Sequence, residues 1–152
     1  MAKKQFIVFK IPDIAWDGLD YLYDLIELKK NDLHFSLVSA DNMEDARRKY
    51  FDSFLKNYYA EDREDLAWQW ASSLCESNEE DEIVKEYGKD DGKILWEITC
   101  KCDDGIFSDK LYGKDYKLKR SLLLSLSNET IDTLMFNEIN GIIAVTEIEI
   151  II

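Results

Sequence analysis

Proline and glycine are scarce in this sequence of 152 residues, which contains one proline and six glycines. Because these residues supply many tight turns and flexible linkers, their scarcity argues against a linker between domains. No stretch approaches the roughly 18–20 apolar residues that a membrane span requires. The apolar patch near the start is broken by Lys10 and lacks a small-residue cleavage site, which argues against a secretory signal. We therefore expect one domain over residues 1–152, without a membrane partner.

Cysteine and histidine, which metal centres and many catalytic sites use, are also rare. The three cysteines, Cys75, Cys100 and Cys102, predict reduced thiols and a cytoplasmic protein, in the host cytoplasm if a phage encodes it. No second C-x-x-C pair is present, and alternation predicts that Cys100 and Cys102 face a core, so no metal site is expected. His34, the single histidine, lacks a nucleophile elbow, so we predict no catalytic residue.

Phosphate-binding glycine motifs are missing, since neither G-x-G-x-x-G nor G-x-x-x-x-G-K-[ST] occurs, and no cofactor is expected. The charge is strongly one-sided, with 32 acidic against 19 basic residues and a net charge of −13. Such a chain is repelled by nucleic acid and by anionic membranes. Its charge suits a basic protein surface instead.

Hydrophobic periodicity predicts an α+β domain with a mostly antiparallel sheet. The first part predicts a β-α-β unit and then a helical middle: strand 5–11, helix 14–30, strand 33–40, and helices 43–59, 62–75 and 79–87. Asp41 and Glu44 resemble a capping box for the helix over 43–59.

The second part predicts a three-stranded antiparallel meander over residues 93–127, because side chains from Ile94 to Cys102 alternate in polarity. A helix over 128–139 and a strand over 142–152 complete the chain. The isoleucines that end this strand would invite pairing if exposed, so a homodimer through the C-terminal strand is one expectation.

Negative charge is concentrated in residues 61–91, which hold twelve carboxylates against three cations. A second row of acids follows one side of the predicted helix over 14–30. Trp68 would add an aromatic anchor if it lies off the buried face of its helix. The predicted partner-binding residues are Glu61, Asp62, Glu64, Asp65, Trp68, Glu76, Glu79, Glu80, Asp81, Glu82 and Glu86, with Asp17, Asp20, Asp24 and Glu27 of the second row.

These features predict a non-enzymatic acidic inhibitor that resembles phage anti-defence proteins in kind. It would mimic nucleic acid and occlude the basic groove of a nuclease or nucleoprotein effector complex, without touching nucleic acid itself. One alternative is an immunity or antitoxin-type protein that neutralises a basic toxin. Another is a small enzyme centred on His34. A solvated acidic face without a partner is the plainest alternative.

Overall fold

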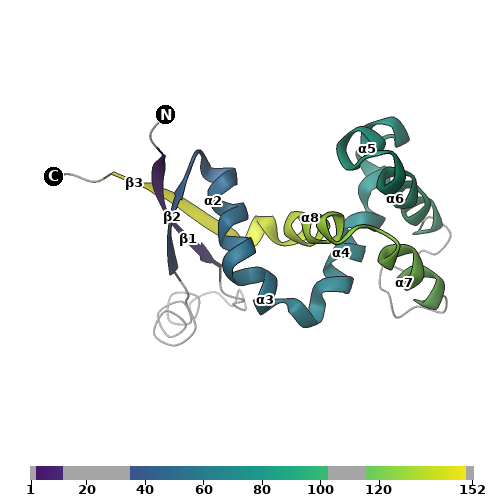
Figure 1. Ribbon diagram of the computed structural model, residues 1–152, viewed down its shortest axis with the longest axis horizontal. Helices are drawn as coiled ribbons and strands as arrows, with labels where there is room; N and C mark the ends of the chain where they lie inside the picture. Colours follow the sequence, from purple (N-terminus) through teal and green to yellow (C-terminus); the bar gives the residue numbers. More distant parts are fainter. Residues whose placement is uncertain (1–2, 12–34, 103–115, 150–152) are drawn as a thin grey trace, which may run out of the picture. The chain divides into compact units, whose positions relative to one another are not determined.

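The computed structural model describes residues 3–11, 35–102 and 116–149 (Figure 1). The chain forms two compact units, the first from Met1–Leu55 with Asn140–Ile152 and the second from Lys56–Ile139. Helices and one three-stranded antiparallel sheet confirm the α+β class. The single domain over 1–152 stays a prediction.

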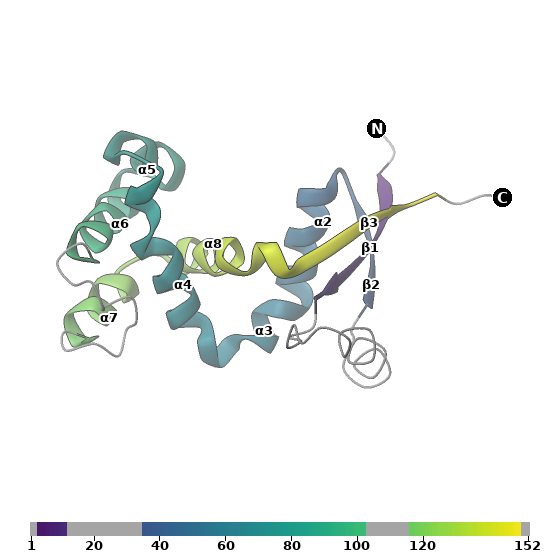
Figure 2. The same cartoon turned by 180° about the vertical axis from the view of Figure 1, so that it is seen from behind.

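The sheet of the first unit has the strand order β2-β1-β3, with antiparallel pairing on both sides of β1 (Figure 2). Strand β1 spans Lys4–Lys10, β2 spans Phe35–Ala40 and β3 spans Ile143–Ile148. These strands fall on the three segments predicted at 5–11, 33–40 and 142–152. The helix predicted over 14–30 and the last three isoleucines lie outside the described residues.

Helix α2, Met43–Tyr50, covers one face of this sheet and bonds to all three strands. The hydroxyl of Tyr50 accepts a hydrogen bond from the Lys10 backbone N–H at 3.3 Å. Arg47 Nε donates to the Ile143 carbonyl at 3.2 Å, and Lys49 Nζ donates to the Ser39 carbonyl at 2.9 Å. Among the described residues of this unit, the buried side chains are Phe6, Val8, Ala40, Ala46, Tyr50, Phe51, Leu55 and Ile143.

The N-terminal cap of α2 differs by one position from the predicted pair of Asp41 and Glu44. The Asn42 side chain accepts the Asp45 N–H at 2.8 Å, and the Asp45 carboxylate accepts the Asp41 N–H at 3.0 Å. Both Asp41 and Asn42 are good cap residues, so the sequence alone did not separate the two registers. After α2 the chain continues as a π-helix, Phe51–Leu55, and then as α3, Lys56–Tyr58.

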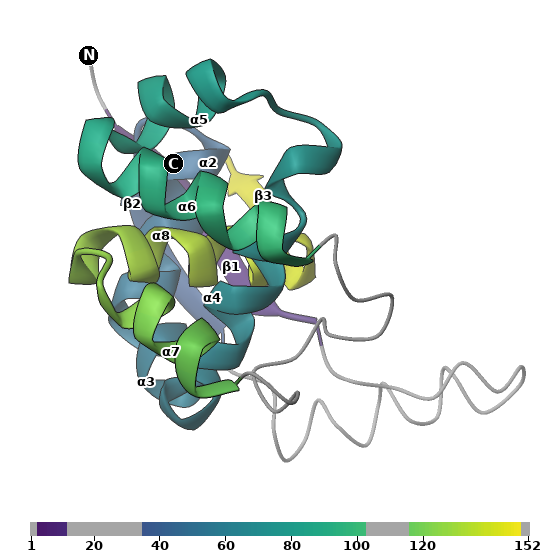
Figure 3. The same ribbon diagram turned by 90° about the vertical axis from the view of Figure 1, so that its right-hand side faces the viewer.

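The second unit is helical in its described part (Figure 3). Helix α4, Arg63–Ser72, packs against α8, Asn128–Ile139, and α5, Glu80–Tyr87, packs against α6, Lys89–Cys102. Helix α7, Tyr116–Leu124, contacts α6 and α4. Three short 3-10 helices complete the described elements of the chain: Ala60–Asp62 and Leu74–Glu76 in this unit, and Asn140–Ile142 in the first. The shared core is Ala67, Trp68, Ala71, Leu74, Ile83, Leu95, Ile98, Leu123, Leu126, Ile131 and Leu134.

The predicted meander over 93–127 is wrong, because the described residues on both sides of 103–115 are helical. In α6 the buried residues are Gly92, Leu95, Ile98 and Thr99, which follow a helical rather than a two-residue period. Cys100 is exposed, so it does not face a core as the strand prediction required. The apolar residues here satisfy both periods, and packing against α5 decides between them.

Candidate acidic binding surface

The α5–α6 pair is held at close distance by two glycines. Gly88 ends α5 with φ at +96°, a conformation that L side chains rarely adopt, and its N–H bonds to the Val84 carbonyl at 2.9 Å. Gly92 lies directly against Val84, since a Cβ placed on it would be 2.5 Å from the Val84 Cα. Ile83 is buried beneath the pair. These contacts fix α5 on α6 and leave its other side in solvent.

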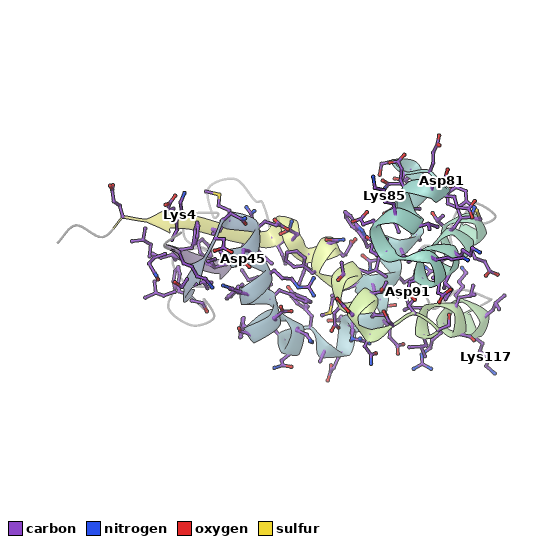
Figure 4. All side chains as sticks on the ribbon, turned by 45° about the horizontal axis from the view of Figure 1, so that its top comes forward. Lys4, Asp45, Asp81, Lys85, Asp91 and Lys117 are labelled. Carbon is purple, nitrogen blue, oxygen red and sulfur yellow. The ribbon has the colours of Figure 1, made fainter. Side chains whose placement is uncertain are left out.

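The solvent side of α5 is acidic. Between Glu79 and Glu86 the chain has five carboxylates and one cation, Lys85. All six side chains are exposed: Glu79, Glu80, Asp81, Glu82, Lys85 and Glu86. Figure 4 shows Asp81 and Lys85 on α5 at one side of the unit. Within the described part of the chain, none of these carboxylates has an ion-pair partner.

The acids of α2 and the adjoining π-helix behave differently, because each is neutralised along its own helix. Glu44 pairs with Arg47 at 3.6 Å, and Asp45 pairs with Lys49 at 3.3 Å. Asp52 pairs with Arg48 at 3.3 Å. Acidic residues at helical spacing from a cation are typical of a solvated helix face. The α5 surface therefore keeps a local negative field that the paired acids of α2 and the π-helix do not.

The acids at the start of α4 divide into two kinds. Glu61 and Asp62 are exposed, as is Glu76 beyond the helix. Glu64 instead binds the Arg120 guanidinium, which holds the pKa of Glu64 below its usual range. Asp65 is half-buried, and its Oδ1 is enclosed without a partner in the described part of the chain. Glu61, Asp62 and Glu76 are therefore available to solvent, whereas Glu64 helps to hold α7.

Trp68 is fully buried, so it is not the aromatic anchor that the sequence suggested. Its ring lies in the core, and the Lys119 ammonium is 5.9 Å from the ring centroid. Leu66 and Trp70 of the same helix are only partly buried. Both tryptophans pack at the same core, Trp68 fully buried and Trp70 partly buried, and the sequence pattern alone does not say which one is the more buried.

Asp91 also serves the fold. Its Oδ2 accepts hydrogen bonds from the Ser127 hydroxyl at 2.8 Å and the Thr130 hydroxyl at 2.5 Å. Burial acts to raise the pKa of Asp91, but these hydrogen bonds outweigh it and the pKa is lowered. Ser127 in turn caps α8 by accepting the Thr130 N–H at 3.2 Å. This carboxylate joins α6 to the start of α8.

Helix α7 carries three cations that the sequence analysis did not single out: Lys117 and Arg120 are exposed, whereas Lys119 is buried against Trp68. The helix contains no acid, and it lies on the other side of α6 from α5 (Figures 1 and 3). An open cavity of about 540 Å³ is lined by Lys117, Arg120, Ser121, Leu124 and Ser125. The run KLKR at 117–120 indicates a cluster of cations, but a strand over these residues would place its cations on two opposite faces. In the described part of the unit, α5 is therefore acidic, whereas α7 carries the exposed Lys117 and the Arg120 that pairs with Glu64.

Other predicted features lie outside the described residues. They include His34 and the acidic row of Asp17, Asp20, Asp24 and Glu27. In the described ranges no group of three or more histidine, cysteine or carboxylate side chains is placed to hold a metal ion. No helix in the same ranges combines the length and apolar character needed to cross a membrane. Comparisons with protein-family models, curated proteins and solved structures find no match.

Proposed function

We propose that this chain is a non-enzymatic acidic inhibitor of the phage anti-defence kind. It occupies the basic groove of a nucleic-acid-handling enzyme or effector complex. The observation that carries this proposal is the α5 surface: five exposed carboxylates with no ion-pair partner among the described residues.

Several unpaired carboxylates on one short helix destabilise the folded state, and no ion pair among the described residues offsets this repulsion. Like charges on neighbouring positions of a helix repel, by a few tenths of a kcal/mol per pair. A basic groove relieves this repulsion on binding, and its field also speeds the encounter. Glu82 and Glu86 lie one helical turn apart, with about 5–6 Å between their Cβ atoms. This spacing is of the same order as the charge repeat along one nucleic-acid strand, about 3.4 Å.

The proposal is tested with a variant that removes charge without reversing it, E79Q/E80Q/D81N/E82Q. Three of these acids lie in the first turn of α5, where lysine would also oppose the helix dipole. The matched control is D41N/E129Q/E147Q/E149Q, which removes the same charge from exposed positions elsewhere. Each tagged protein is used for affinity capture from host-cell extract at about 0.05 and 0.5 M salt, since exposed charges are screened within roughly 3–8 Å at high ionic strength.

We expect the wild type and the control to recover a nuclease or nucleoprotein complex at low salt only. The α5 variant should recover about tenfold less, because rim charges chiefly govern association. Equal recovery by the two variants would show that α5 is not the contact. Recovery of a single basic toxin that carries no nucleic-acid-handling activity would favour the immunity-protein alternative over the inhibitor.

A further inference from the structure

The two edges of the sheet in the first unit are not alike (Figure 2). Strand β3 carries Glu147 on the face that α2 covers, opposite the buried Phe6, and Glu147 pairs there with Lys4 at 3.7 Å. An inward-pointing charge is one of the devices by which proteins keep an edge strand from pairing with another chain. Strand β2 forms the other edge, and its six residues, FSLVSA, include no such device.

Strand β2 combines the features that favour pairing at a sheet edge. It contains no charged residue and no proline, and its register with β1 runs from Phe35 to Ala40 without a bulge. On the sheet face opposite α2, Leu37 is 76% exposed and Phe35 is 48% exposed. Among the described residues no strand lies on the outer side of β2. The Ser39 carbonyl accepts from Lys49 at 2.9 Å, so an added strand would be centred nearer to Leu37.

A second copy of this chain supplies a strand with matching charge. In a twofold-symmetric dimer, equivalent residues of the two copies lie across the axis, so a charge near the axis faces the same charge. An uncharged strand avoids this repulsion, and β2 is uncharged throughout. The first unit as a whole has 12 acidic and 8 basic residues, whereas the second has 20 and 11. The first unit is therefore the part of the chain that repels its own copy less.

We propose that two copies of the chain pair through antiparallel β2 strands, with Leu37 on the twofold axis. This register places Leu37 opposite its equivalent and Phe35 opposite Ser39. Both pairs lie on the sheet face opposite α2, so the apolar area that Leu37 and Phe35 expose becomes smaller. The two sheets join into one, and the interface does not depend on whether α5 binds a basic groove.

Helix α2 leaves room for this arrangement. It bonds to all three strands and is therefore centred near β1, the middle strand. With strands about 4.8 Å apart, the α2 helices of the two copies would lie roughly 14 Å apart. Helices in contact lie about 8–10 Å apart, so the two α2 helices do not prevent the strands from pairing.

Analytical ultracentrifugation of the full chain from about 5 µM to 0.5 mM tests the proposal, because a dimer is favoured as concentration rises. The wild type should approach twice the 17.8 kDa of the chain. Leu37→Lys should raise the dimer dissociation constant at least about tenfold, since two ammonium groups would face each other at the axis. The matched control is Thr146→Lys on the same sheet face of β3, which is also exposed and should leave the constant unchanged.

Mixing two variants tests the register. Leu37→Glu should be as monomeric as Leu37→Lys, whereas an equimolar mixture of the two should restore the dimer, because the introduced lysine and glutamate then lie opposite each other. An unfolded variant would not regain dimerisation in this mixture. The variant E79Q/E80Q/D81N/E82Q should dimerise like the wild type, so failure of either proposal leaves the other standing.

Any of three results would overturn the proposal. One is a wild type that stays monomeric at about 0.5 mM, which would leave the β2 edge to an extended peptide of another protein. Another is a dimer that Thr146→Lys breaks and Leu37→Lys does not, which would place the interface on β3. The third is a mixture of the two Leu37 variants that stays monomeric.

Discussion

Arg120 on α7 donates from Nε and Nη2 to both carboxylate oxygens of Glu64 on α4, at 2.8 and 3.0 Å. This two-point, charge-assisted contact links α7 to α4. The Arg120 side chain is 51% exposed and that of Glu64 33%, so solvent screens the pair. Its contribution to stability is therefore modest and depends on pH.

Replacing Arg120 by alanine should lower the free energy of unfolding by about 0.5–1 kcal/mol at pH 7. The hydrogen bond from Arg120 lowers the pKa of Glu64 below 4.5, so the pair stabilises the fold above that pH. The contribution is lost as pH falls through the lowered pKa. Urea unfolding of wild type and R120A at pH 7 and at about pH 3 measures this. An equal difference at both pH values would contradict the prediction.

Asp91→Ala should destabilise the protein by about 1–3 kcal/mol, because it leaves the buried Thr130 hydroxyl without its carboxylate partner. Asp90→Ala is the neighbouring control, since Asp90 is exposed and its loss should change little. The lowered pKa of Asp91 means that its contribution is present above pH 3.8 and is lost as pH falls below it. Chemical unfolding of both variants checks this, and similar losses for the two would argue against the Asp91 network.

Gly92→Ala should cost about 1–3 kcal/mol, because the new methyl group would meet the Val84 Cα at 2.5 Å and force α5 away from α6. Gly141→Ala is the control, since nothing lies within 4 Å of its added Cβ. The control should be neutral or slightly stabilising. Thermal unfolding compares the two. Shortening Val84 to alanine should not rescue Gly92→Ala, because the clash involves the backbone atom, and a full rescue would disprove this account.

Glu138→Gln should raise stability at neutral pH. Burial raises the pKa of Glu138 above 4.5, so the folded state disfavours its charged form. The penalty is full above the raised pKa and disappears as pH falls below 4.5, where both states hold the proton. The gain from E138Q should therefore be seen by urea unfolding at pH 7 and vanish at about pH 4. A gain that is independent of pH would point to packing instead.

Much of the fold could be predicted where one periodicity stands alone. Strand β1 has β-branched and aromatic residues that end at Pro12, and α8 follows a polar cap and ends before Asn140-Gly141. The helix over Lys89–Cys102 could not be predicted, because the apolar residues of this segment fit the period of a strand and that of a helix equally. Packing against other elements, including the Val84–Gly92 contact with α5 and the contacts with α4 and α7, selects the helix.

The sequence predicted that residues 61–91 are rich in acids, but it only partly predicted which of these acids are exposed and unpaired. A count of carboxylates does not separate Glu82, which is exposed, from Asp91, which bonds to α8, or Glu64, which pairs with α7. These differences arise from residues distant in sequence, such as Arg120 and Ser127. Trp68 failed as an anchor for the same reason, since its burial depends on helices that the local pattern does not contain.

The Gly88 turn and the Gly92 contact have a consequence for peptide competitors. Helix α5 has eight residues, and isolated helices shorter than about 12–15 residues are marginal in water. A synthetic copy of Glu79–Gly88 would carry the same charges yet spend most of its time unfolded, so it should displace the intact protein poorly. The binding that we propose for this surface would therefore require the folded pair of α5 and α6, and a minimal fragment designed to test it would have to include both.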